Sequence, residues 1–123
     1  MDWKKIKHFK REEFVCHHCD VEHMDEEFML MLDAARDQAG VAIAISSGYR
    51  CAKYDQAVGG KDNHTTGKAA DLMVENSRSR FEMLGALLDV GFKRIGIGKT
   101  FIHVDACDEK ENKPVNVIWH YYT

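Results

Sequence analysis

Three side chains in the sequence have the types and the spacing that a metal site requires: His64, Asp71 and His103. Two imidazoles and one carboxylate are a common ligand set for catalytic zinc, and they leave a fourth position for water. In a straight strand His64 and Asp71 would lie roughly 23 Å apart, so they can share an ion only if the chain folds back. Gly67 lies between them and gives the loop that freedom. The spacing alone is weak support, because a single histidine is more often a surface or core residue than a ligand.

The third of these residues lies in a segment, 101–106, that alternates between apolar and polar side chains. Alternation with a period of two predicts a strand in which Ile102 and Val104 pack inward. His103 and Asp105 then share the opposite face of that strand. Two polar groups on a strand inside a small domain indicate a functional site.

The four cysteines raise a separate question. Cys16 and Cys19 enclose two histidines, whereas Cys51 and Cys107 lie far along the chain. Cys16, Cys19 and Cys51 could form a thiolate metal site or a disulfide, or remain ordinary reduced thiols. A zinc finger would need a second closely spaced ligand pair, and none follows in the sequence. The histidines before the first clear helix are expected to be solvated unless Cys16 and Cys19 recruit one of them: His8, His17, His18 and His23.

Length and composition limit the classes of protein to consider. The chain has 123 residues, 17 Lys and Arg against 20 Asp and Glu, and a formal charge of −3. One domain over residues 1–123 is expected, and the absence of a basic excess excludes a dedicated nucleic-acid binder. Residues 1–13 lack the apolar stretch of a secretory signal, and the longest apolar run, Phe28–Leu32, is far short of the roughly 20 residues that span a bilayer. We therefore expect neither nucleic acid nor membrane as a partner.

The periodicity of the sequence predicts the elements that must position these side chains. Apolar residues at helical spacing predict a helix from Met24 to Ala39 that stops at Gly40. The following elements are expected to be a strand over 41–45, a turn over 46–50, a short helix over 51–58 and a strand over 68–74.

A second long helix is expected before three more strands. Ser79 and Glu82 have the spacing of a capping box, Phe81, Leu84 and Leu88 share one face, and Gly91 ends the helix. The strands are expected over 94–97, 101–106 and 115–122. Without regular alternation of helix and strand, this order predicts an α+β fold with a mainly antiparallel sheet and helices packed on one side.

Four motifs occur in an order typical of one family of enzymes. They are SSGYRC (46–51), AVGG (57–60), HTTGKAADL (64–72) and FIHVD (101–105). The chain resembles zinc peptidases that include D-alanyl-D-alanine carboxypeptidases and phage L-alanyl-D-glutamate endopeptidases, whose metal-site fold is shared with the hedgehog signalling domain. The resemblance runs from about Phe9 to Trp119, and SGYR followed by H-x-x-G-x-A-x-D is its most specific part.

The resemblance implies roles for individual residues. His64, Asp71 and His103 become the zinc ligands, and Arg50 becomes the residue that holds a substrate carboxylate or carbonyl and stabilises the oxyanion. A guanidinium suits that role because it stays charged and offers a fork of donors. We expect Tyr49 to pack beneath the site.

The general base departs from the family pattern. Relatives often place a Glu three residues before the last His, or a His just before it, but those positions here are Thr100 and Phe101. Asp105 is the best candidate for the base, and it could equally orient a ligating histidine and fix its tautomer. His120 is the second candidate for the base.

The resemblance implies a zinc-dependent peptidoglycan peptidase that cuts a stem peptide. The bond could be D-Ala-D-Ala, L-Ala-D-Glu or a cross-bridge. With no signal peptide, we expect a monomeric phage or prophage endolysin that accumulates in the cytoplasm and acts on the cell wall after release. The alternative is a non-catalytic zinc-containing module of the same fold, for wall binding or phage structure, because the usual Glu and His near His103 are missing.

Overall fold

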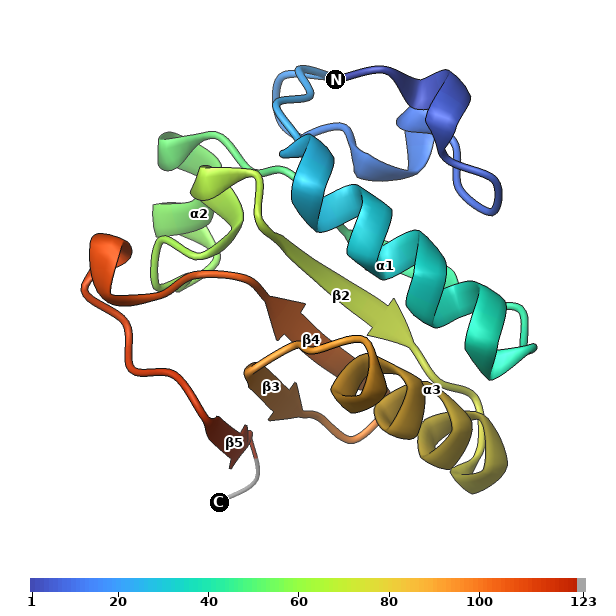
Figure 1. Ribbon diagram of the computed structural model, residues 1–123. Helices are drawn as coiled ribbons and strands as arrows, with labels where there is room; N and C mark the ends of the chain where they lie inside the picture. The colour runs from blue at the N-terminus through green and yellow to red at the C-terminus, as the bar shows by residue number, and fades with distance from the viewer. Residues whose placement is uncertain (122–123) are drawn as a thin grey trace.

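The computed structural model describes residues 1–121 and is built around a five-stranded sheet (Figure 1). The strand order is β1-β2-β4-β3-β5; only the β3–β5 pair is parallel, and the other three pairs are antiparallel. The strands are β1 (Ala44–Ser47), β2 (Ala69–Met73), β3 (Arg94–Ile97), β4 (Phe101–Asp105) and β5 (Val117–His120). The helices are α1 (Glu26–Ala39), α2 (Ala52–Ala57) and α3 (Ser77–Asp89). The predicted α+β class with a mainly antiparallel sheet is confirmed.

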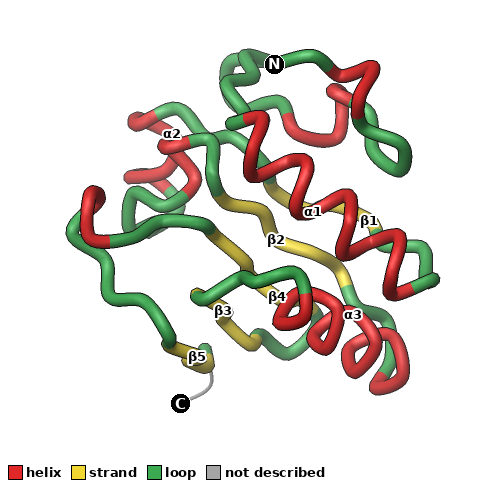
Figure 2. Tube along the Cα trace, viewed as in Figure 1, coloured by secondary structure: helices red, strands yellow, loops and turns green. Residues whose placement is uncertain are grey.

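Helices α1 and α3 lie side by side over one face of the sheet (Figures 1 and 2). Their apolar side chains, such as Phe28 and Leu87, share one buried core with Leu72 of β2 and Ile102 of β4. The opposite face of β2 and β4 is therefore left for polar groups. Among residues 1–121, every helix is too short or too polar to traverse a lipid bilayer.

Local capping explains where α1 begins and ends. The carboxylate of Asp25 accepts a hydrogen bond from the backbone N–H of Phe28 at 2.9 Å, which satisfies a free donor of the first turn. Gly40 adopts a left-handed conformation at φ +68°, where a side chain would be disfavoured. The predicted helix and its stop at Gly40 are confirmed, but the helix begins at Glu26, two residues after the predicted Met24.

Two other elements differ from the expectations. The predicted strand over 41–45 is wrong in its bounds, because β1 begins at Ala44, opposite Met73, the last residue of β2, so 41–43 have no partner strand. Strand β5 is shorter than 115–122: it begins at Val117, since Asn116 adopts a left-handed φ of +62°, and residue 122 lies outside the described residues.

The predicted capping box of α3 is wrong, and the predicted apolar face is wrong at Phe81 and Leu88, whereas Leu84 packs against the core. Asn76 caps the helix by accepting from the N–H of Ser79, so Ser79 lies in the third helical position rather than at the cap. Phe81 is 73% exposed and Leu88 46% exposed, while Met83, Ala86 and Leu87 are buried. Adjacent stripes of a leucine-rich helix have similar hydrophobicity, so packing against α1 decides which stripe is buried.

Candidate active site

A tight turn brings His64 back toward β2. His64 opens a 3-10 turn (His64–Thr66) that ends at Gly67, whose φ is +76°. A side chain at Gly67 would collide with the carbonyl oxygen of His23, so the turn requires glycine on steric grounds as well. His64 Nε2 consequently lies 3.4 Å from Asp71 Oδ1. The expected fold-back at Gly67 is confirmed.

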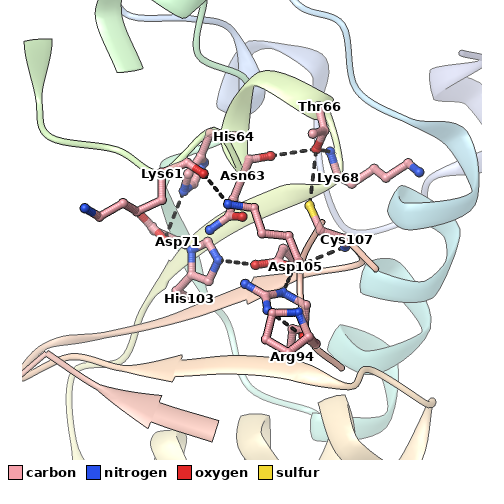
Figure 3. Close-up of polar contacts among 12 residues, drawn as sticks. Lys61, Asn63, His64, Thr66, Lys68, Asp71, Arg94, His103, Asp105 and Cys107 are labelled. Atoms are coloured by element: carbon pink, nitrogen blue, oxygen red, sulfur yellow. Dashed lines mark hydrogen bonds and ion pairs between the residues drawn. The ribbon is translucent and has the colours of Figure 1, made fainter. Parts of the chain in front are cut away.

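The register between β2 and β4 adds the third side chain. Asp71 and His103 are direct partners across this antiparallel pair, and Asp71 Oδ1 lies 2.9 Å from His103 Nδ1. His64 Nε2, Asp71 Oδ1 and His103 Nδ1 can form one cluster, since one ligand atom from each residue lies within 4.8 Å of the others (Figure 3). The structure thus brings together the three residues that the sequence singled out.

The hydrogen bonds of both imidazoles leave a lone pair toward that cluster. His64 Nδ1–H can donate only outward, to the carbonyl oxygen of Gly48 at 2.8 Å, and His103 Nε2–H donates to Asp105 Oδ2 at 2.7 Å. The remaining ring nitrogens, each an acceptor in the neutral imidazole, face Asp71 Oδ1. Three acceptors that meet at one point suit a cation, so the donor set fits a metal ion such as zinc.

The pKa shifts of these groups have the same physical origin. Burial lowers the pKa of His103, but its hydrogen bonds to Asp105 and Asp71 outweigh burial and raise it. Burial raises the pKa of Asp71, but hydrogen bonds from the rings of His103 and His64, when these rings are protonated, outweigh burial and hold it well below its usual range. The site therefore favours a positive charge between its carboxylates, as a proton on His103 or as a metal ion.

Asp105 lies behind the ring of His103, on the side away from Nδ1. It is 0% exposed, and it accepts hydrogen bonds from Arg94 Nε at 2.6 Å and from the N–H of Cys107 at 3.1 Å (Figure 3). Burial raises the pKa of Asp105, but the contacts with His103 and Arg94 outweigh burial and lower it. Of the two roles expected for Asp105, this geometry favours orienting His103.

Arg50 projects from the loop after β1 toward Asp71. Its Nη2 donates to Asp71 Oδ2 at 3.3 Å, its Nη1 to Asp55 Oδ1 at 3.0 Å and its Nε to Ser47 Oγ at 3.0 Å. Asp55 is buried, whereas the Arg50 side chain keeps 15% of its surface exposed. Three acceptors thus fix the guanidinium beside the candidate metal ligands, with one part of it open to a substrate.

These groups line an open cavity of about 400 Å³. Its wall includes Arg50, His64, Asp71, His103, Asn63, Phe101 and Tyr121. Among the described residues, the Oδ1 atom of Asn63 is the one buried side-chain oxygen or nitrogen that has no hydrogen-bond partner.

Strand β5 and the residue after it, Tyr121, supply two aromatic rings that sequence reasoning missed. The Trp119 ring lies 5.6 Å from the His103 ring, and Tyr121 lies 5.3 Å from Phe101 between ring centroids. Their approach depends on Gly96, where a Cβ would lie 2.6 Å from Trp119 Nε1. Alternation along β5 turns His120 to the outer side.

The remaining expectations concern the base positions and Tyr49. Phe101 lines the cavity, and the carbonyl of Thr100 accepts the N–H of Val74 at 2.9 Å. Neither side chain can take a proton from water at neutral pH. Tyr49 packs against the core and against the ring of His23, in the passive role expected for it.

Arg94 and Asp55 are buried charges beside the site that sequence reasoning missed. Arg94 is the direct partner of Asp105 across β3 and β4, and Asp55 lies in the first turn of α2, the helix that follows Arg50. The Arg94 pairing depends on strand register, and the Arg50–Asp55 pair depends on how the loop after β1 turns into α2.

Two histidines and an aspartate that converge at an open cavity on an α+β fold are an arrangement typical of metal-dependent hydrolases. Residues 7–105 match the family model described as Peptidase M15. The chain belongs to this family of zinc metallopeptidases, which confirms the resemblance seen in the motifs. No curated protein matches the chain significantly.

Proposed function

We propose that this chain is a zinc-dependent peptidase that hydrolyses a bond in the stem peptide of peptidoglycan, with zinc held by His64, Asp71 and His103. The observation that carries this proposal is the convergence of two imidazole nitrogens and a carboxylate oxygen beside Arg50 in an open cavity. When bound, zinc supplies Lewis acidity, which lowers the pKa of a water molecule and polarises the scissile carbonyl.

The chain's own residues provide binding and orientation. Asp105 holds the His103 ring so that Nδ1 faces the cavity, which makes Asp105 a positioning residue. Arg50 presents a fixed guanidinium to the developing oxyanion or to a substrate carboxylate.

Tyr121 offers a second donor at the rim of the cavity. Burial and the nearby carboxylates of Asp71 and Asp105 raise the pKa of its phenol, so it keeps its proton at neutral pH. A hydroxyl in that state donates a hydrogen bond to substrate oxygen and does not act as a base.

The biological setting is part of the same proposal. The family and the motifs support a cell-wall peptide as substrate, and the proposal adds storage in the cytoplasm before release. A monomeric phage or prophage endolysin combines these properties.

The activity is tested by incubating purified peptidoglycan with the protein, in the presence and in the absence of a chelator. We expect the turbidity to fall, new amino groups to appear, and both effects to vanish with the chelator and with Asp71→Ala. Asp37→Ala is the matched control, because the Asp37 side chain is 71% exposed and lies outside the cavity. Mass analysis of the released muropeptides identifies the bond that is cut.

One observation favours a second candidate function, a non-catalytic zinc module for wall binding or phage structure. Thr100 and Phe101 occupy the positions where relatives often carry the base. Tight zinc binding and wall binding with no released amino groups would support this module and contradict the peptidase.

A further inference from the structure

Three cysteines gather at a second place, away from the cavity. The Sγ atoms of Cys16, Cys19 and Cys51 all lie within 4.8 Å of one another. Cys16 follows the 3-10 turn Arg11–Phe14 and is buried, Cys19 is exposed in the next turn, and Cys51 caps α2. Two segments more than thirty residues apart thus present three sulfurs to one point.

Backbone groups around the cluster favour thiolates. The N–H of Cys51 points at Cys16 Sγ, and the N–H of Tyr54 points at Cys51 Sγ, both at 3.4 Å. The turn after Cys16 is closed by the N–H of Asp20, which donates to the Cys16 carbonyl at 2.9 Å. N–H donors aimed at sulfur stabilise negative charge there, which is the state that binds a metal ion.

One histidine lies beside the three sulfurs, next to Cys51, and would become a fourth ligand after a shift of its ring. His18 Nδ1 lies 3.5 Å from Cys51 Sγ, and its ring stacks on Tyr54 with an interplanar angle of 7°. His17 is engaged elsewhere, because its Nε2 lies 3.0 Å from the carbonyl oxygen of Ser46. Of the two histidines in the C-H-H-C sequence, His18 therefore lies beside the cluster and His17 contacts the backbone of β1.

We propose that Cys16, Cys19, Cys51 and His18 bind a structural zinc ion, distinct from the ion of the cavity. Three sulfurs and one imidazole are a common ligand set for closed, tetrahedral zinc sites. Zn–S bonds of about 2.3 Å bring tetrahedral sulfurs to about 3.8 Å from one another, so a small contraction of the cluster suffices. A disulfide would use two of the sulfurs and leave the third unpaired.

This second ion would tie the N-terminal segment to the loop that carries Arg50. Cys51 is the next residue after Arg50, and the N–H of Tyr49 donates to the Phe14 carbonyl at 3.0 Å. The ion would therefore reinforce an existing contact between the same two segments. The proposal stands independently of the peptidase activity.

The proposal is tested by measuring the zinc content of a variant that lacks the ligands of the cavity site. In His64→Ala/Asp71→Ala, purified with a reductant and dialysed, we expect one zinc ion per chain by elemental analysis. Adding Cys19→Ser should remove that ion, because Cys19 is the exposed member and its loss disturbs packing least. Adding Cys107→Ser instead is the matched control and should leave the ion in place, since Cys107 lies outside the cluster.

Cobalt gives an optical readout that is independent of folding defects in the cysteine variants. Co²⁺ bound by thiolates absorbs in the near ultraviolet by charge transfer from sulfur, and the cavity site offers no sulfur ligand. The His64→Ala/Asp71→Ala variant should show this band at one equivalent of Co²⁺. The proposal is overturned if the His64→Ala/Asp71→Ala variant holds no zinc and shows no such band with Co²⁺. It is also overturned if the intact mass of the chain is two hydrogens below that of the fully reduced chain, which indicates a disulfide.

Discussion

The substitution Asp105→Asn separates orientation of His103 from simple burial of a charge. The Asp105 carboxylate accepts from Arg94 Nε at 2.6 Å, from His103 Nε2 at 2.7 Å and from the N–H of Cys107 at 3.1 Å. An Asn side chain has one acceptor oxygen and one NH₂ group. If the NH₂ group faces His103, the ring must place its proton on Nδ1. If it faces Arg94, two donors meet in a buried site.

Both arrangements have a cost that follows from these contacts. Loss of the carboxylate behind a ligating histidine typically weakens metal binding about 10- to 100-fold, which is about 1.4 to 2.7 kcal/mol. Breaking a buried ion pair such as Arg94–Asp105 typically costs about 3–5 kcal/mol of stability. We expect the lower end, about 3 kcal/mol, because the Asn oxygen still accepts one hydrogen bond.

Two measurements check these magnitudes. Competition with a chromophoric chelator gives the zinc affinity, and urea unfolding in excess chelator gives the stability of the metal-free chain. Asp37→Asn makes the same chemical change at an exposed carboxylate and should alter neither. If Asp105→Asn binds zinc as tightly as the wild type and hydrolyses peptidoglycan at the same rate, both expected roles of Asp105 are wrong.

Three further changes have defined outcomes. Arg50→Lys keeps the charge but loses the fork of donors, so kcat/KM for peptidoglycan fragments should fall about 100-fold while the zinc affinity in a chelator competition changes little. Gly96→Ala should lose about 1–3 kcal/mol in urea unfolding because its Cβ would meet the aromatic rings of β5, whereas Gly85→Ala, where a Cβ meets nothing within 4 Å, should gain up to about 1 kcal/mol. For the metal-free chain, the lowered pKa of Asp105 contributes stability above about pH 4 that is lost on acidification, and the raised pKa of His103 contributes stability below about pH 6.5 that is lost as pH rises through its folded value. Urea unfolding in chelator should therefore show a maximum between these values, and a flat profile would contradict the paired geometry.

The local features of the site could be predicted from the sequence because they depend on short-range chemistry. Gly67 between His64 and Asp71 indicated a fold-back, and the alternation over 101–106 put His103 and Asp105 on one face. Both features follow from backbone sterics and from the two-residue period of a strand.

The features that depend on register could not be predicted in the same way. Arg94 meets Asp105 only because β3 and β4 pair with that alignment, and Trp119 reaches His103 only because β5 runs parallel to β3. Two adjacent stripes of α3 are similarly apolar, so packing against α1 determines which of them is buried. Such choices are made between segments that are distant in sequence.

The charged groups around the cavity determine the distance over which the site attracts an anionic substrate electrostatically. Three cationic side chains, Arg50, Lys61 and Arg94, stand against three carboxylates, Asp55, Asp71 and Asp105, so these groups sum to zero charge when both histidines are neutral. A bound divalent ion raises this sum to two net positive charges, inside a chain whose formal charge is −3. An anionic peptide terminus is therefore drawn in only within about a Debye length, about 8 Å at physiological salt. Capture of substrate by this site should depend on close encounter and respond weakly to ionic strength.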